Sequence, residues 1–281
     1  MPRFAANLHY LFTEVPFLDR FEAAASAGFK GVEFQVPYDF AAQELRRRLD
    51  GSGLKMVLFD GPMGDWQQGD RGLAAVAGRE REFRAGLARV VEYGQALGCD
   101  TVHLMAGVVG SGQDYAVAEQ VYLQNLRYAC GFLEPHGIHV VIEPINNLLG
   151  TISNGPSYTT RGMHGYFLNH TIQARRIVEQ VGANNLSLHL DCYHMQLLEG
   201  HLADTIRENI SLVRHFQIAG VPGRHEPDAG EIHYPYLFDL IDELGYRGWI
   251  GCEYRPKAGT WRGLGWAAKY GIRVPSERIG A

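Results

Sequence analysis

The stretch His139 to Ile145, HVVIEPI, decides the fold. Its run of apolar and β-branched residues is typical of a strand that is buried on both faces, as in a parallel sheet. The C-terminal end of this strand carries a carboxylate, Glu143, followed by Pro144. A buried charge needs a partner, because leaving it unpaired costs several kcal/mol. The stretch therefore indicates a functional site as well as a fold.

Three later segments end in the same way as the first. LSLHLD reaches Asp191, VRHFQIAG carries Gln217 and GWIGCEYRP carries Glu253. Each segment is followed by loop residues and then by a helical pattern. Catalytic side chains of a parallel barrel project from the C-terminal ends of its strands, so we expect these four oxygen-bearing side chains to converge.

Eight strand-like segments alternate with helical patterns along the chain. The predicted strands are 4–8, 30–34, 55–60, 101–107, 139–145, 186–191, 213–220 and 248–254, and the predicted helices are 16–28, 41–49, 79–97, 115–136, 171–181, 203–212 and 234–244. This order favours a (β/α)8 barrel over an open doubly wound sheet. We expect a single domain over residues 1–281, with a long loop at 146–169 and a loosely held tail over the last dozen residues. The loop 61–78 is long enough to be a functional cover.

Composition limits the classes of function. The chain has 281 residues, 46% of them apolar, and a net charge of -5. It has no long Lys/Arg run, which argues against a nucleic-acid partner and favours a small-molecule substrate. No apolar run is long enough for a membrane span, and no leader pattern is found, so we expect a soluble cytoplasmic protein. Four widely spaced cysteines without CxxC spacing predict reduced thiols. The composition does not decide whether the protein forms a homo-oligomer.

The four strand-end side chains predict a metal site. Three carboxylates buried together would repel, so either their pKa values rise or a cation binds them. The proposed ligands Glu143, Asp191, Gln217 and Glu253 all offer oxygen, which suits Mg²⁺ or Mn²⁺ better than structural zinc. No GxGxxG or P-loop motif is found, so we expect no organic cofactor. The alternative is that these acids are ordinary caps or pair with arginine.

Other polar residues follow the same strands. His194, three residues after Asp191, would lie in a loop close enough to reach the same ion or its ligand; alternatively, it is a partly buried histidine bonded to the backbone. Arg224 could fork onto a substrate carboxylate or hydroxyl pair, or it could be a surface residue paired with Glu226 or Asp228. Glu33 and His103 face the same choice with weaker support.

Several motifs together resemble the hydroxypyruvate isomerase family, within the xylose-isomerase-like barrel superfamily. They are FAANL at 4–8, GVEFQVPYDF at 31–40, GREREFR at 78–84, EPIN at 143–146, DCYHMQ at 191–196, FQIAGVPGRHEPDAGEIHY at 216–234 and GWIGCEYRP at 248–256. The resemblance covers almost the whole chain. It implies a (β/α)8 fold, interconversion of hydroxypyruvate and tartronate semialdehyde, metal at the four positions above, and Glu143 and Glu253 as the acid/base pair. His194 and Arg224 match substrate contacts of the similar ketose 3-epimerases.

The resemblance leaves the substrate open. The segment from about 150 to 170 is longer than in the family, and isomerases of 2-oxotetronates, four-carbon sugar acids, belong to the same group. Ketose 3-epimerases carry His where Gln217 stands. A DNA-repair endonuclease of this superfamily would need more histidine ligands and a basic face, whereas a non-catalytic sugar-acid sensor would have no use for two facing glutamates. For an isomerase, a divalent ion would stabilise the enediolate of an α-hydroxy carbonyl while two carboxylates move the proton.

Overall fold

The computed structural model describes residues 1–110, 112–147 and 163–273. Eight parallel strands close into a barrel in sequence order, each bonded to the next and β8 to β1. The strands are β1 (Arg3–Asn7), β2 (Gly31–Glu33), β3 (Lys55–Asp60), β4 (Thr101–His103), β5 (His139–Ile142), β6 (Leu186–Asp191), β7 (Val213–Ile218) and β8 (Trp249–Cys252). The predicted (β/α)8 fold is confirmed.

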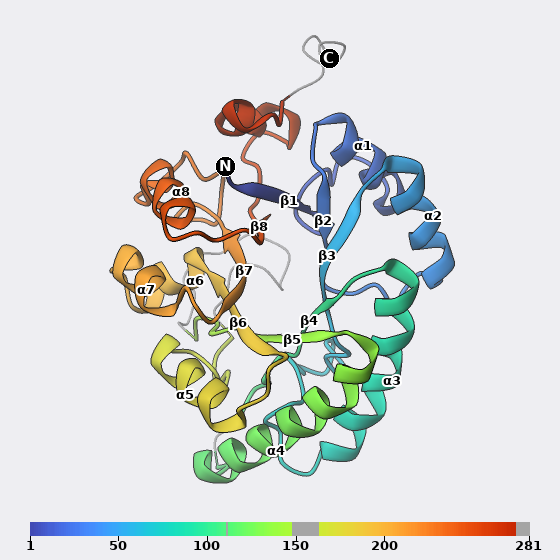
Figure 1. The fold of residues 1–281 in the computed structure, drawn as a ribbon, viewed down its shortest axis with the longest axis vertical. Helices are drawn as coiled ribbons and strands as arrows, with labels where there is room; N and C mark the ends of the chain where they lie inside the picture. The colour runs from blue at the N-terminus through green and yellow to red at the C-terminus, as the bar shows by residue number, and fades with distance from the viewer. Residues whose placement is uncertain (111, 148–162, 274–281) are drawn as a thin grey trace.

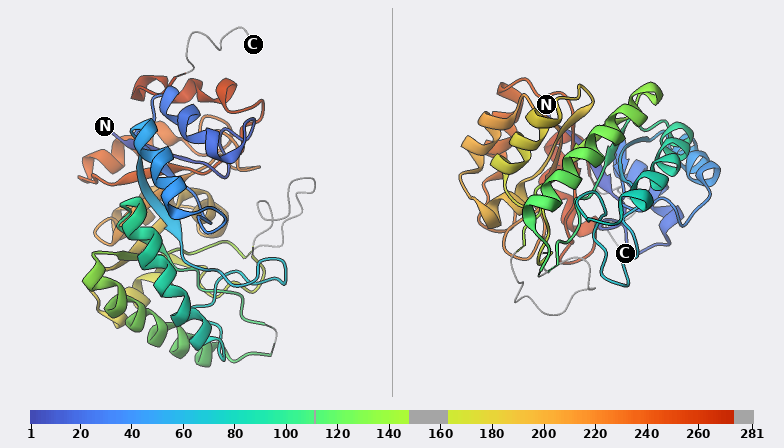
Figure 2. Two further views of the ribbon diagram at one scale, coloured as in Figure 1. Left: turned by 90° about the vertical axis from the view of Figure 1, so that its right-hand side faces the viewer. Right: turned by 90° about the horizontal axis from the view of Figure 1, so that it is seen from below.

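The helices form an outer ring that follows the strands in chain order (Figure 1). They are α1 (Arg20–Ser26), α2 (Ala42–Ser52), α3 (Glu80–Leu97), α4 (Tyr115–Leu133), α5 (Thr171–Val181), α6 (Cys192–Leu198), α7 (Leu202–Asn209) and α8 (Tyr234–Glu243), with the 3-10 helices η1 (Phe17–Asp19), η2 (Glu134–His136) and η3 (Trp261–Tyr270). Figure 2 shows the same ring from two further sides, with α3 and α4 lying against one another. No helix among the described residues is long and apolar enough to cross a membrane.

Two helices were not predicted from the sequence. Helix α6 begins directly after β6, because the Asp191 side chain accepts a hydrogen bond of 2.8 Å from the Tyr193 amide and caps it. The expectation that His194 lies in a loop is therefore wrong: it lies in the first turn of α6. The second, η3, lies between α8 and α1 (Figure 1) and closes the outer ring.

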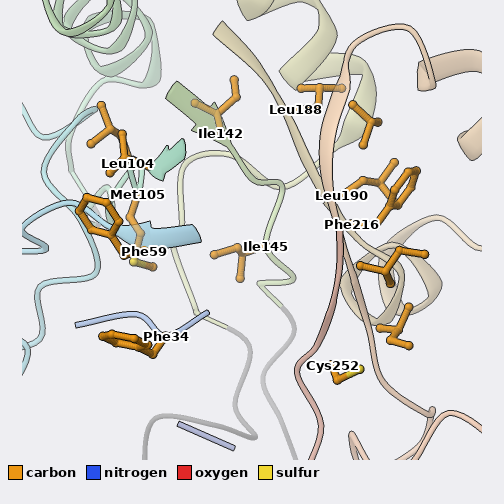
Figure 3. Close-up of a cluster of buried hydrophobic side chains, with 14 of the residues drawn as sticks. Phe34, Phe59, Leu104, Met105, Ile142, Ile145, Leu188, Leu190, Phe216 and Cys252 are labelled. Atoms are coloured by element: carbon orange, nitrogen blue, oxygen red, sulfur yellow. The ribbon is translucent and has the colours of Figure 1, made fainter. Parts of the chain in front are cut away.

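Alternate residues of the strands face opposite sides. Leu188, Leu190 and Phe216 point outward and belong to the apolar layer between the strands and the helices; Figure 3 shows part of it, from Phe34 and Phe59 to Cys252. The residues between them on β6 and β7 are polar and line the inside of the barrel, as the contacts below show. All four cysteines are buried and free, as expected.

Two predicted segments fall partly outside the described residues. Of the loop 146–169, residues 148–162 lie outside them; the backbone N–H of Met163 donates to the Asn146 carbonyl at 2.9 Å. Of the predicted tail, residues 274–281 lie outside them, while Ile272 is buried and Arg273 donates from its backbone to Ala27. The structure thus gives both ends of the long loop a fixed place beside β5.

Candidate active site

The four predicted ligands lie at the C-terminal ends of consecutive strands. Glu143 follows β5 directly, Asp191 ends β6, Gln217 lies in β7 and Glu253 follows β8. All four side chains are buried. Asp191 and Gln217 are register partners in neighbouring strands, so they point to the same side of the sheet. The closed parallel barrel is what brings these residues, 110 positions apart in the chain, to one end of the molecule.

Arg224 lies between two of these carboxylates. Its Nη2 is 2.9 Å from Asp191 Oδ2 and 2.9 Å from Glu253 Oε1, and its Nε donates to the Glu253 carbonyl at 3.2 Å. The guanidinium also lies over the rings of Tyr10 and Tyr193, at 5.2 and 5.0 Å from their centroids. Only 6% of Arg224 is exposed. The alternative of a surface arginine is wrong, because the loop after β7 folds it into the barrel mouth.

His194 joins the acidic cluster from α6. Its Nε2 lies 3.5 Å from Asp191 Oδ2 and 3.8 Å from Glu143 Oε1. Its Nδ1 meets the Asn146 side-chain amide at 2.7 Å. Because an amide nitrogen donates, Nδ1 is the accepting nitrogen and Nε2 carries the proton. Burial lowers the pKa of His194 well below its usual value, so this side chain is neutral at pH 7.

Burial sets the charge of the acids. It raises the pKa of Glu143 well above its usual value, and it raises that of Glu253 to about 8 even though Arg224 acts in the opposite direction. The pKa of Asp191 is also raised, by burial first. Burial by itself would lower the pKa of Arg224, but the negative charge of the facing Glu253 outweighs this, and the pKa is raised above its usual value. One fixed cation thus meets three buried carboxyls, and at neutral pH the cluster keeps protons that a further cation would displace.

The donor set fits a divalent ion. Glu143, Asp191 and His194 each offer one ligand atom, and the three atoms lie within 4.8 Å of one another. The Oε1 atom of Gln217 is buried and has no hydrogen-bond partner of normal geometry among the described residues. Two carboxylates and an amide oxygen are donors that divalent metals accept. Of the predicted set, Asp191 and Glu253 are the members that Arg224 engages.

Glu33 fixes the orientation of Gln217. It accepts hydrogen bonds from Asn7 Nδ2 at 3.0 Å, from Gln217 Nε2 at 2.6 Å and from His215 Nε2 at 2.6 Å. Since β2 and β7 are not neighbours, the bonds to β7 cross the barrel interior. A side chain at Gly251 would fill this space, because an added Cβ would lie 2.3 Å from both Glu33 oxygens. Glu33 therefore lies below the predicted site and holds the amide so that its oxygen points away from Glu33.

His103 approaches Glu143 from β4, the strand next to β5. Its Nδ1 is 3.2 Å from Asp60 Oδ1 and 3.7 Å from Glu143 Oε2. It is buried, as are His189 and His215. The His189 ring makes a T-shaped contact with each of the other two rings, at centroid distances of 5.4 and 5.2 Å.

The sequence analysis did not single out His189, His215, Asp60 or Tyr10. A signal for the two histidines was present: His189 and His215 stand two positions before Asp191 and Gln217, which puts each on the same face of its strand as a proposed ligand.

Comparisons with known proteins agree with this geometry. The family model for the xylose isomerase-like TIM barrel matches residues 21–270. The 2-oxo-tetronate isomerase of Cupriavidus necator is 50% identical over 270 residues, which are 96% of this chain and 99% of that protein. The hydroxypyruvate isomerase of Escherichia coli is 41% identical, over 96% of this chain and 100% of that protein.

A crystal structure from Brucella melitensis titled AP endonuclease, family 2, has a TM-score of 0.89 and 47% sequence identity, over 96% of this chain and 99% of that one. The isomerase names of the relatives agree with a buried pair of carboxyls at the mouth of a parallel barrel. This chain is an enzyme of the isomerase class, and it belongs to the xylose isomerase-like TIM barrel family.

Proposed function

We propose that this enzyme isomerises a 2-oxotetronate, a four-carbon sugar acid, by exchanging the carbonyl at C2 with the hydroxyl at C3. The observation that carries the choice of substrate is the highest identity: relatives named 2-oxo-tetronate isomerase are 50%, 44% and 41% identical, against 41% for the hydroxypyruvate isomerase of Escherichia coli and 43% for a human relative named putative hydroxypyruvate isomerase. Hydroxypyruvate, which the motifs suggest first, is the second candidate, and it undergoes the same exchange on three carbons.

The reaction needs one proton to leave C3 and one to arrive at C2, while the hydroxyl proton passes from the oxygen on C3 to the oxygen on C2. Glu143 and Glu253 are suited to this, because both are buried and both have pKa values raised toward or above neutrality. One of them in its carboxylate form removes the proton from C3, and the other in its protonated form returns a proton to C2. Buried carboxyls hold and release protons near pH 7, which an exposed glutamate with a pKa near 4.3 does not do.

A divalent ion would stabilise the negative charge that develops on the substrate oxygens. Glu143 and Asp191 would hold it, with Gln217 and Glu253 completing the predicted ligand set. Mg²⁺ and Mn²⁺ are the ions we propose, since all four ligands offer oxygen. His194 has a different role open to it, since its neutral Nε2–H can donate to a substrate oxygen.

Arg224 would bind the substrate carboxylate. Its Nη2 and Nε are engaged with Asp191 and Glu253, while its Nη1 makes no hydrogen bond within the described residues. A guanidinium donates from a fixed planar fork, so the engaged nitrogens hold Nη1 in one direction. This arrangement suits recognition of an acid rather than of an uncharged ketose.

The alternatives give different results in one assay. Metal-depleted enzyme should be supplied with Mn²⁺ or Mg²⁺ and offered a 2-oxotetronate, hydroxypyruvate or a four-carbon ketose, with products followed by NMR. We expect kcat/KM for the 2-oxotetronate to exceed that for hydroxypyruvate by at least ~10-fold, the discrimination that one additional polar group can provide. The reverse ratio would replace our substrate by hydroxypyruvate, and turnover of the ketose alone would make the enzyme an epimerase.

A sugar-acid binding protein without catalysis would show thermal stabilisation by these acids and no product. A DNA endonuclease is disfavoured by the net charge of -5, which supplies no phosphate-binding surface. We also propose that the enzyme works in the cytoplasm, where four free buried thiols stay reduced.

A further inference from the structure

The two oxygens of Glu143 face two different groups of side chains. Oε1 lies 3.8 Å from His194 Nε2, on the side of Asp191. Oε2 lies 3.7 Å from Nδ1 of His103 and 3.7 Å from Nδ1 of His189. A carboxylate placed in this way can bind one ion with each oxygen.

The ring of His189 lies near the side chain of Gln217 but makes no hydrogen bond of normal geometry with it. It is 1% exposed, and neither ring nitrogen has a hydrogen-bond partner of normal geometry among the described residues. Buried polar atoms without a partner are uncommon and call for an explanation. A neutral imidazole keeps one nitrogen lone pair, which is the group that a metal ion binds.

His103 has one ring nitrogen beside a carboxylate and the other without a partner among the described residues. A carboxylate accepts hydrogen bonds, so the 3.2 Å contact with Asp60 Oδ1 places the ring proton on Nδ1. Nε2 then carries the lone pair, and it has no partner among the described residues. A carboxylate bound to the far nitrogen fixes the tautomer and the direction of a metal-binding imidazole.

We propose that His103, His189 and Oε2 of Glu143 bind a second divalent ion, for which Zn²⁺ is the best match. Ligand atoms of the three residues lie within 4.8 Å of one another. Ligands of one tetrahedral zinc ion lie roughly 3.4 Å apart, as follows from bond lengths near 2.1 Å, so side-chain shifts well under the length of a bond would close the site. Two imidazoles and one carboxylate form a donor set that favours zinc over magnesium. His189 stands two residues before Asp191 on β6, which places this site deeper in the barrel.

Filling this site has a consequence that rests on the proposed function. Glu143 can act as a base only if one of its oxygens is free, and a zinc ion on Oε2 would take the oxygen that faces away from the first ion. Zinc should therefore inhibit an enzyme that is already loaded with Mn²⁺. Binding of the ion itself does not depend on the identity of the substrate.

The test measures how many zinc ions the full-length protein binds. Metal-depleted protein should be titrated with Zn²⁺ by calorimetry, and the retained metal measured after dialysis. We expect two equivalents for the parent and one for His189→Gln or His103→Gln. The matched control is His139→Gln, which removes a half-buried imidazole from the start of β5, outside both groups, and should keep two. Circular dichroism checks that each variant is folded.

A crystal of the parent soaked in zinc gives a measurement that needs no variant. Anomalous scattering at the zinc edge should locate an ion between His103 and His189. A single equivalent in the parent with no such peak overturns the proposal, as do two equivalents that both substitutions leave unchanged.

Activity separates this proposal from the proposed function. In the presence of saturating Mn²⁺, added Zn²⁺ should lower the parental rate at least ~10-fold, the contribution of a lost general base being usually larger, and should leave His189→Gln unaffected. If two zinc ions bind while the rate is unchanged, the site stands and the role of Glu143 as base is wrong.

Discussion

At the residue scale, the Arg224 side chain forms ion pairs with two carboxylates at once. Its Nη2 meets Asp191 and Glu253 at the same distance of 2.9 Å, and its backbone φ of +57° turns the loop so that the side chain enters the barrel. A non-glycine residue rarely adopts this backbone conformation, and such strain is found mainly at functional sites. The position is thus constrained by both the backbone and the charge.

Replacing either proposed catalytic acid should slow the reaction without unfolding the protein. Glu143→Gln and Glu253→Gln keep the size of the side chain and one oxygen ligand but remove the group that carries the proton. We expect kcat to fall at least ~10²-fold in each variant. Exchange of the substrate C–H with solvent deuterium, followed by NMR, should show which step is lost.

The matched control is Glu226→Gln. Glu226 is equally buried, but it accepts a hydrogen bond from the Lys257 amide at 2.9 Å, a role that a glutamine oxygen can fill. If both active-site variants turn over as fast as this control, the two-carboxylate mechanism is wrong, and His194 becomes the next base to test.

Arg224→Lys should raise KM for an acid substrate. Lysine keeps the positive charge but cannot contact two carboxylates and a substrate from one planar group. Loss of a charge-assisted hydrogen bond of about 1.5 kcal/mol predicts a rise of at least ~10-fold, measured in steady-state kinetics. Arg46→Lys, in an exposed pair with Asp50, is the control. Equal KM values for the two variants would assign Arg224 no part in substrate binding.

His139 predicts a dependence of stability on pH. Burial lowers its pKa from 6.5 to about 4 in the folded protein, so the unfolded chain takes up a proton first as the pH falls. The unfolded state then binds more protons, and the free energy of unfolding decreases as pH falls from about 6.5 to about 4. Urea titrations across this range should show a weaker dependence for His139→Gln than for the parent. An identical slope would contradict the assignment.

At the scale of elements, the junction of β6 and α6 assembles much of the site. Asp191 ends the strand, caps the helix, pairs with Arg224 and lies 3.5 Å from His194. The N-terminus of a helix stabilises a negative charge, so the bond from the Tyr193 amide opposes the rise in the pKa of Asp191 that burial causes. The end of the strand, the helix cap and the first helical turn therefore fix the positions of Asp191 and His194 together.

The loop after β5 is expected to set the size of the substrate. Its described ends meet at the 2.9 Å bond between Met163 N and Asn146 O, and the Asn146 side chain contacts His194. The segment between these two ends is therefore attached to the barrel beside the site. Shortening the segment 148–162 should change the ratio of kcat/KM for the four-carbon and three-carbon acids. A shortened variant with an unchanged melting temperature and the parental ratio would refute this role.

At the scale of the whole molecule, the barrel buries more acids than fixed cations. Glu33, Asp60, Glu143, Asp191 and Glu253 are all buried, and Arg224 is the arginine that lies among them in the described residues. A metal ion that binds the native state alone should stabilise it by about 3 kcal/mol at a hundredfold excess over its Kd. We expect chelation to lower the melting temperature and abolish activity, and Mn²⁺ to restore both.

Asp191→Asn should weaken this stabilisation, because an amide is a poorer ligand than a carboxylate for a hard cation. Chelator-treated parent that keeps its melting temperature and its full activity would remove the metal from the proposed function.

The sequence by itself determined the barrel and the strand ends that bear the site. Alternation of apolar strands and amphipathic helices leaves few architectures, and in a parallel barrel every strand presents its C-terminal end to the same side. The position of Glu143 after HVVI and of Asp191 after LSLHL was therefore enough to place both at one end of the molecule. Local patterns are sufficient for this placement, because the sequence of each strand shows by itself which residue stands at its C-terminal end.

Only the tertiary structure decided which side chains meet. Glu33 bonds to Gln217 and His215 across the barrel, and Arg224 reaches back from its loop to Asp191. These contacts depend on strand register, on barrel closure and on a left-handed backbone at Arg224, none of which leaves a periodic trace in the chain. The physical reason is that periodicity fixes the face on which a residue lies, whereas its partners are fixed by the closure of the sheet.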